Sequence, residues 1–262
     1  MELDANRSDF IELHGSCLFV SDAHFHTPQN LDSQLREEFF LQLLDEYNSI
    51  DHLFLLGDIF DFWFEYKDVA PKGYFRLFNA LYEKNKQGTK IHFFSGNHDM
   101  WVRDYFIKSF DAKIYRKEQK FLINNNKFLI AHGDGLGGKQ RRYNLIKKIF
   151  NFKPNQFLYS ILHPIFAFSI ARFFSKQSRN SHNEDDLIFK SESEFQIRYA
   201  RNILKLQHFD FFIFGHRHIP IKYNLSDSST FFNTGDWIKK YSYVIYNSND
   251  ISPKLEFFKP KQ

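Results

Sequence analysis

The chain has 262 residues, of which 43% are hydrophobic and 25% are charged, with a formal net charge of +4. This composition is typical of a folded globular protein and excludes the disordered and fibrous classes. The single cysteine, Cys17, excludes an internal disulfide framework and a cysteine-based zinc site. Residues 1–16 contain acids and no apolar core, so we expect no signal peptide and predict a cytosolic location.

Short apolar strands and helices are expected to alternate in the first half of the chain. A helix over 32–47 has an apolar face of Leu35, Phe39 and Leu43, with Asp32 as its N-cap. Further helices are predicted over 74–86, where Gly88 ends the helix, and over 100–110. Strands are predicted over 17–20, 52–56 and 91–95, and a hairpin over 121–131 turns at Asn124-Asn125-Asn126.

The second half begins with a long segment, from about 138 to 207, that predicts helices and no strands. Strands then return over 211–214, 221–224, 231–233, 242–246 and 255–258. We therefore expect one α/β sandwich domain over residues 1–262 with a helical insert at about 138–207.

Polar stretches follow five of the apolar strands. They are Asp22-Ala23-His24, Gly57-Asp58, Gly96-Asn97-His98-Asp99, His132-Gly133-Asp134 and Gly215-His216-Arg217-His218. The carboxyl ends of strands are where α/β folds place their sites. Carboxylate, imidazole and amide ligands suit divalent ions such as Mn²⁺, Fe²⁺ or Zn²⁺, and an aspartate can bridge two of them. The pattern predicts a site for two metal ions that acts on phosphate.

These five stretches, in this order, resemble those of the calcineurin-like metallophosphoesterases. The resemblance implies a four-layer αββα sandwich and a role for each polar residue. Asp22, His24 and His218 would bind the first ion; Asn97, His132 and His216 would bind the second; Asp58 would bridge the two. His98 would contact the phosphate as general acid or charge stabiliser, and Asp99 would orient His98 through a hydrogen bond. Mn²⁺ is the expected metal, with Fe²⁺ or Zn²⁺ as alternatives.

The insert combines apolar and basic residues. Residues 157–174 are rich in Phe, Leu and Ile, and nine basic residues with no acid lie between 139 and 183. They are Lys139, Arg141, Arg142, Lys147, Lys148, Lys153, Arg172, Lys176 and Arg179. Either this segment is a helix pair packed on the sandwich, or its helices lie on an anionic membrane surface and admit an acyl chain. A solvated helical face usually mixes charges, which favours the membrane interpretation.

A metallophosphoesterase core with such an insert is similar to the family of UDP-2,3-diacylglucosamine pyrophosphohydrolases of lipid A synthesis. Gly57-Asp58-Ile59-Phe60-Asp61-Phe62-Trp63 matches the aromatic-rich second motif of that family. The resemblance implies hydrolysis of UDP-2,3-diacylglucosamine to UMP and 2,3-diacylglucosamine 1-phosphate, at the cytoplasmic face of the inner membrane. Tyr143, Arg179 and Asn180 would contact the substrate.

Two positions depart from that family. His98 stands where its well-studied proteobacterial members carry arginine, and Gln140 stands where an acidic substrate contact is expected. A soluble phosphatase or phosphodiesterase acting on nucleotides or phosphoproteins therefore remains an alternative, as does a nuclease. No nucleic-acid partner is expected, because the aromatic residues of the insert lie in apolar runs rather than as isolated stacking positions.

Overall fold

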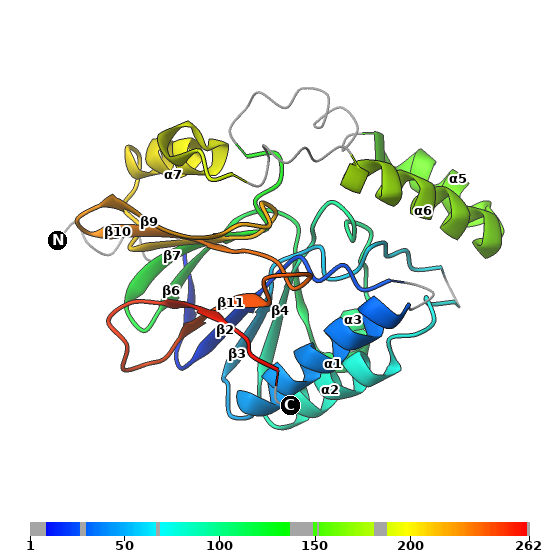
Figure 1. Cartoon of the computed structure of the whole chain (residues 1–262), viewed down its shortest axis with the longest axis horizontal. Coiled ribbons are helices and arrows are strands. Elements are labelled where there is room, and N and C mark those ends of the chain that lie inside the picture. The colour runs from blue at the N-terminus through cyan, green and yellow to red at the C-terminus, as the bar shows by residue number, and fades with distance from the viewer. Residues whose placement is uncertain are drawn as a thin grey trace.

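The computed structural model describes residues 9–26, 30–66, 69–136, 149–150, 152–180 and 188–260, without the side chains of 172 and 174–180. Two six-stranded sheets lie face to face, and helices cover the outer face of each (Figure 1). The predicted four-layer αββα sandwich is confirmed.

The first sheet has the strand order β12-β11-β2-β3-β4-β5. Its strands β2 to β5 are parallel, whereas β11 runs antiparallel to both of its neighbours, β2 and β12. The bounds are β2 Cys17–Val20, β3 His52–Leu55, β4 Lys90–Phe94, β5 Lys113–Tyr115, β11 Ser242–Tyr246 and β12 Lys254–Phe257. The short edge strand β5 has no counterpart among the predicted strands.

The second sheet has the order β1-β6-β7-β8-β10-β9. The predicted hairpin joins its antiparallel strands β6 and β7, with Asn124 and Asn125 at φ of 47° and 66°, as a type I′ turn requires. The bounds are β1 Ile11–Leu13, β6 Gln119–Ile123, β7 Asn126–Ala131, β8 Phe211–Phe214, β9 Pro220–Ser226 and β10 Ser229–Thr234.

Side-chain alternation along each strand builds the layers. In β2, Cys17 and Phe19 point between the two sheets, where they join Phe54, Phe128 and other apolar side chains of both. Leu18 and Val20 point to the opposite face. The aromatic-rich composition therefore fills a continuous core between the sheets.

Three helices cover the outer face of the first sheet: α1 Leu31–Glu46, α2 Phe75–Lys86 and α3 Tyr105–Phe110. The N-cap of α1 is Asn30, whose Oδ1 accepts from the Ser33 amide at 2.8 Å, so the prediction of Asp32 was wrong. Of the predicted apolar face, Leu43 is fully buried and Phe39 packs against the core, whereas Leu35 is 52% exposed. Only the last half of the predicted 100–110 helix forms.

The fourth layer is α7, Phe195–Leu204, which packs on the second sheet through Ile197 and Ala200. It lies within the predicted insert, after the short helix η2 at Ser191–Ser193. The other described helices of that segment, α5 Lys153–Ile161 and α6 Pro164–Asn180, form a pair at one end of the sandwich, apart from α7 (Figure 1).

Aromatic side chains join α5 and α6 to the sandwich. Tyr159 contacts Phe62, Phe64 and Trp101, with ring centroids 6.0, 4.8 and 4.9 Å apart. Phe168 of α6 also contacts Phe62. Because Phe62 follows the Gly57-Asp58 stretch by four residues, the helix pair is attached directly beside that polar loop.

Candidate metal centre

The five polar stretches converge at one edge of the sandwich. Each begins where β2, β3, β4, β7 or β8 ends, and these strands lie next to one another in the two sheets. Backbone hydrogen bonds tie the loops together: the amides of Asp22 and His24 donate to the carbonyls of Gly57 and Asp58 at 3.1 and 2.9 Å. Parallel pairing of adjacent strands thus places residues far apart in sequence in one cluster.

Left-handed backbone marks this cluster. Asp22, His24, Asp58, His216 and His218 have φ between 44° and 72°. Non-glycine residues rarely adopt this conformation, which costs about 1–3 kcal/mol each and concentrates at functional sites. Five of the seven predicted metal ligands are therefore held in a backbone geometry that their residue types do not favour.

The first group of ligands consists of Asp22, His24 and His218, whose ligand atoms lie within 4.8 Å of one another. His218 Nε2 is 3.3 Å from Asp22 Oδ1, and the His24 and His218 rings lie 5.2 Å apart at 22°. The other oxygen of Asp22 accepts from the His216 amide at 2.8 Å and from the Ser21 hydroxyl. Asp22 therefore keeps one oxygen for the cluster.

The second group consists of Asp58, His132 and His216. Asp58 Oδ2 lies 3.5 Å from His132 Nε2 and 3.8 Å from His24 Nε2, so this one carboxylate faces both groups. Asn97 joins the second group, with its Oδ1 3.3 Å from His132 Nε2. All seven predicted ligands thus lie together, and the ligand atoms of His24, Asp58 and His98 also lie within 4.8 Å of one another.

Buried polar atoms without partners show that the cluster fits metal ions. Within the described residues, Asp22 Oδ1 and both ring nitrogens of His24 are buried and make no hydrogen bond. Such atoms are costly unless something satisfies them. A divalent cation bound by carboxylate and imidazole would satisfy both residues.

The electrostatics agree with this fit. Burial lowers the pKa of His24 and of His216 to about 3, which keeps both imidazoles in the neutral form that binds metal. Burial also opposes protonation of His132, but the Asp58 carboxylate overrides it and raises the pKa of His132 to about 10. Asp58 thus favours a positive charge next to His132 Nε2, where a cation would lie.

The tautomer of His132 is set by a backbone carbonyl. Its Nδ1 donates to the Leu56 carbonyl at 2.7 Å, so Nε2 is the nitrogen that faces Asn97 and Asp58 and at which a metal ion would replace the proton. Gly57 follows immediately, and a Cβ on it would lie 2.6 Å from His132 Nδ1, so a side chain there would displace the ring. Nothing in the sequence predicts that the Leu56 carbonyl binds His132.

The expected hydrogen bond from Asp99 to His98 is not the one that forms. His98 Nδ1 donates to the Asp61 carbonyl at 2.9 Å. Asp99 instead accepts from the amides of Gly96 and Ile59 at 2.7 and 2.9 Å and so joins two of the polar loops. Burial and the nearby Asp58 carboxylate raise the pKa of Asp99 to about 7. Asp99 is a structural link between loops, because both of its oxygens are used by backbone amides.

Further support comes from residues behind His24. Asp61 Oδ1 lies 3.8 Å from His24 Nδ1, and Asp61 Oδ2 lies 3.9 Å from His26 Nε2. The buried Arg36 donates to His26 Nδ1 at 3.1 Å and to the Ala23 carbonyl at 2.8 Å. Arg36 on α1 was missed in the sequence, since a helical arginine carries no motif.

The predicted substrate contacts are not described. Tyr143 lies outside the described residues, and Arg179 and Asn180 belong to α6 but their side chains are not described.

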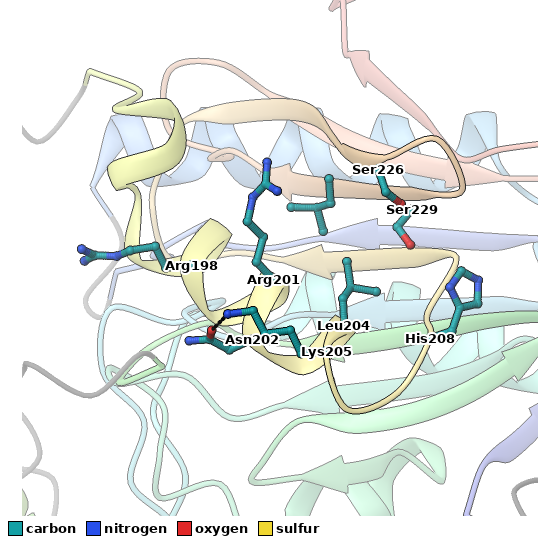
Figure 2. A pocket seen from close by; sticks show the side chains of 9 residues that line it. Arg198, Arg201, Asn202, Leu204, Lys205, His208, Ser226 and Ser229 are labelled. Carbon is teal, nitrogen blue, oxygen red and sulfur yellow. Dashed lines mark hydrogen bonds between the residues drawn. The ribbon is translucent and has the colours of Figure 1, made fainter.

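A hollow of about 590 Å³ lies away from the cluster, between α7 and the β9–β10 hairpin (Figure 2). Its described lining includes Arg198, Arg201, Lys205 and no predicted metal ligand. This hollow is therefore separate from the candidate centre.

Comparison with known proteins places the chain. The calcineurin-like phosphoesterase family matches residues 16–220, a span that includes all five polar stretches. The chain belongs to this family. Its members are metal-dependent hydrolases of phosphoester and pyrophosphate bonds that bind two divalent ions, so the chain is a metal-dependent phosphoric-ester hydrolase.

Several curated relatives share one name. A UDP-2,3-diacylglucosamine hydrolase of Porphyromonas gingivalis is 30% identical over 247 residues, which cover 89% of this chain and 94% of the relative. A UDP-2,3-diacylglucosamine hydrolase of Proteus mirabilis is 28% identical over 207 residues, covering 78% and 82%. Among solved structures, the E. coli phosphoesterase Yfce aligns over 93% of this chain and 100% of its own, with 15% identity and a TM-score of 0.42. That likeness adds nothing to the assignment.

Proposed function

We propose that this enzyme hydrolyses the pyrophosphate bond of UDP-2,3-diacylglucosamine, releasing UMP and 2,3-diacylglucosamine 1-phosphate for lipid A synthesis. The observation that carries the proposal is a pair of ligand groups sharing Asp58, with a strongly apolar helix pair attached beside it. The curated relatives named for this activity support it.

Two divalent ions, Mn²⁺ in preference to Fe²⁺ or Zn²⁺, would be held by the seven ligands. Asp22, His24 and His218 would hold one ion, Asn97, His132 and His216 the other, and Asp58 both. When bound, such ions supply a nucleophilic water at neutral pH and neutralise charge on the phosphoryl oxygens.

The protein itself prepares the reacting groups. The Asp61 carbonyl fixes Nδ1 of His98, so that Nε2 is the atom left for the substrate. When protonated, Nε2 would donate to a phosphoryl oxygen and stabilise the charge that develops there. The Leu56 carbonyl holds the His132 ring through Nδ1, so this ligand needs little rearrangement when the substrate arrives.

Polar and apolar regions beside the cluster match the two halves of the substrate. A hollow of about 320 Å³ adjoins His132, and its lining mixes the basic Arg116 and Lys117 with the acidic Glu118 and Asp134, so it offers polar partners of both charges to the nucleotide half. On α5 and α6, apolar side chains face outward: Phe157, Leu158, Ile161, Ile165, Phe166 and Phe173 are all more than 60% exposed. Apolar area of this kind suits acyl chains and a membrane surface.

Peripheral attachment to the cytoplasmic face of the inner membrane follows from this proposal. None of the helices in the described residues is long and apolar enough to cross a membrane. Lys153 at the start of α5 is the one member of the basic group whose side chain is described, and it would lie near lipid headgroups. The proposed arrangement therefore has the α5–α6 pair lying on the membrane and not through it.

The experiment is hydrolysis of UDP-2,3-diacylglucosamine in detergent, measured as UMP release with and without Mn²⁺. A simple phosphodiester is assayed in parallel. Release of UMP supports the proposal. Cleavage of the simple diester alone would move the substrate to the soluble phosphodiesterase alternative.

A further inference from the structure

Gln196, at the start of α7, joins two of the metal-ligand loops. Its Nε2 donates to the Gly215 carbonyl at 3.0 Å and to the Gly133 carbonyl at 3.3 Å. Gly133 directly follows His132, and Gly215 directly precedes His216. One fully buried amide thus bridges the backbone beside both imidazoles of the second ligand group.

The oxygen of the Gln196 amide is also hydrogen-bonded. Gln196 Oε1 accepts from Asn233 Nδ2 at 2.9 Å, and the same Nδ2 donates to the Gly215 carbonyl at 2.6 Å. Asn233, at the end of β10, is also fully buried. Both amides therefore have fixed orientations, because turning either one would set a donor against a donor or an acceptor against an acceptor.

Two residues before Gln196, a buried ion pair makes a second contact with the loop that carries His216. Glu194, 2% exposed, faces the Arg217 guanidinium, with Oε1 2.9 Å from Nε and Oε2 accepting from Nη2 at 3.2 Å. Arg217 lies between His216 and His218, both of which have left-handed φ. A loop that holds this conformation needs strong external contacts, and Glu194 and Gln196 supply them.

We infer that Gln196 is a positioning residue for the His132–His216 metal position. It does not touch the ion; it fixes the spacing of the two loops that carry its ligands. The inference rests on the proposed two-ion function. It also means that α7, the last helix of the predicted insert, contacts the sandwich through residues that position the proposed metal ligands.

The test is metal binding by Gln196→Met, which keeps side-chain length but removes the amide. Free Mn²⁺ is measured by EPR during titration of the metal-free full-length protein. We expect one of the two ions to bind about 10–100-fold more weakly while the other keeps its wild-type affinity, the usual scale for loss of a supporting contact. Ile197→Val, a buried change on the same helix, controls for general destabilisation and should leave both ions unaffected.

Wild-type affinity for both ions in Gln196→Met would overturn the inference, as would equal weakening of both. If that variant does not fold, Gln196→Asn keeps the amide but shortens the reach by one methylene, and the same selective loss is expected. If the wild type binds two ions and the variant shows no selective loss, only the role of Gln196 is refuted and the proposed function stands. Fewer than two ions in the wild type refutes the proposed function as well.

Discussion

Asp58 Oδ2 lies 3.5 Å from His132 Nε2. The same oxygen faces His24 Nε2 at 3.8 Å, so one carboxylate connects the two ligand groups. Its partner oxygen accepts from the His98 amide at 2.8 Å, which fixes the carboxylate plane. Both proposed metal positions therefore depend on the side chain of Asp58.

Asp58→Asn is expected to lower phosphodiester hydrolysis by at least about 100-fold, because an amide cannot supply the shared anionic oxygen. Mn²⁺ titration should show that both ions are weakened together, unlike the selective loss expected for Gln196→Met. Asp227→Asn, the same change at an exposed position between β9 and β10, serves as the matched control and should retain two ions. Near-wild-type turnover in Asp58→Asn would refute the shared-carboxylate arrangement.

His98→Ala should lower kcat by about 10²–10⁴-fold while both Mn²⁺ ions still bind, since in the proposed function the ring would donate to the substrate and is not among the proposed ligands. His98→Arg should recover part of the loss, because a guanidinium also presents N–H donors near the phosphate. The measurements are turnover of a simple diester and Mn²⁺ stoichiometry. Loss of an ion in His98→Ala would reassign His98 as a ligand.

Three exposed residues of the helix pair are expected to control membrane binding. Replacing Phe157, Ile165 and Phe166 by Ser should reduce co-flotation with anionic vesicles by more than about 10-fold, since each buried apolar side chain contributes about 1.5–3 kcal/mol. Hydrolysis of a small diester should be unchanged. Phe75→Ser, which removes an 81% exposed Phe from α2, is the control. Equal flotation of the triple variant and this control would argue against α5 and α6 as the attachment site.

Two buried histidines between the sheets predict an acid-sensitive core. His52 Nε2 donates to the His14 carbonyl at 3.0 Å, so its Nδ1 accepts from His92 Nε2 at 3.1 Å, and His92 Nδ1 accepts from the Tyr115 hydroxyl at 3.2 Å. This chain of donors and acceptors is complete only when both rings are neutral. Burial lowers the pKa of His92 to about 3 and also lowers the pKa of His52.

An unfolded histidine has a pKa of about 6.5, so below that pH the unfolded state takes up protons that the folded state does not. The free energy of unfolding should therefore fall as the pH drops from about 6.5 toward 3, by up to about 1.4 kcal/mol per unit for His92. Urea unfolding of His92→Gln across this range should show a shallower fall than wild type. His208→Gln, at an exposed position, is the control. Parallel curves for wild type and His92→Gln would contradict the account.

The sequence predicts the candidate metal-binding side chains better than it predicts the residues that hold them in place. The clustering of the candidate ligands could be predicted because each follows an apolar strand, and parallel strands bring their carboxyl ends to one edge. Gln196, Glu194 and Arg36 could not, because they act on backbone carbonyls or on other side chains, and such contacts leave no spacing pattern. The role of Asp99 was mistaken for the same reason: its partners are backbone amides of two separate loops.

The fold divides in a similar way. Strands with four or more consecutive buried residues, such as β2, β3 and β8, were predicted within a residue, because an apolar run of this length suits a central strand. The three-residue edge strands β1 and β5 were missed, since they are too short to show alternation. In α1, Leu43 is buried as predicted, but Leu35 is exposed while Arg36 and Glu37 are buried, so hydrophobic periodicity located only part of the buried face.

UMP release from UDP-2,3-diacylglucosamine by wild type and Asp58→Asn, in detergent with Mn²⁺, tests the central claim most directly. The account predicts metal-dependent release of UMP and 2,3-diacylglucosamine 1-phosphate by the wild type, and at least about 100-fold less in the variant. A wild-type enzyme that cleaves a simple phosphodiester but releases no UMP would contradict the proposed substrate. Equal release by both proteins would contradict the proposed metal centre.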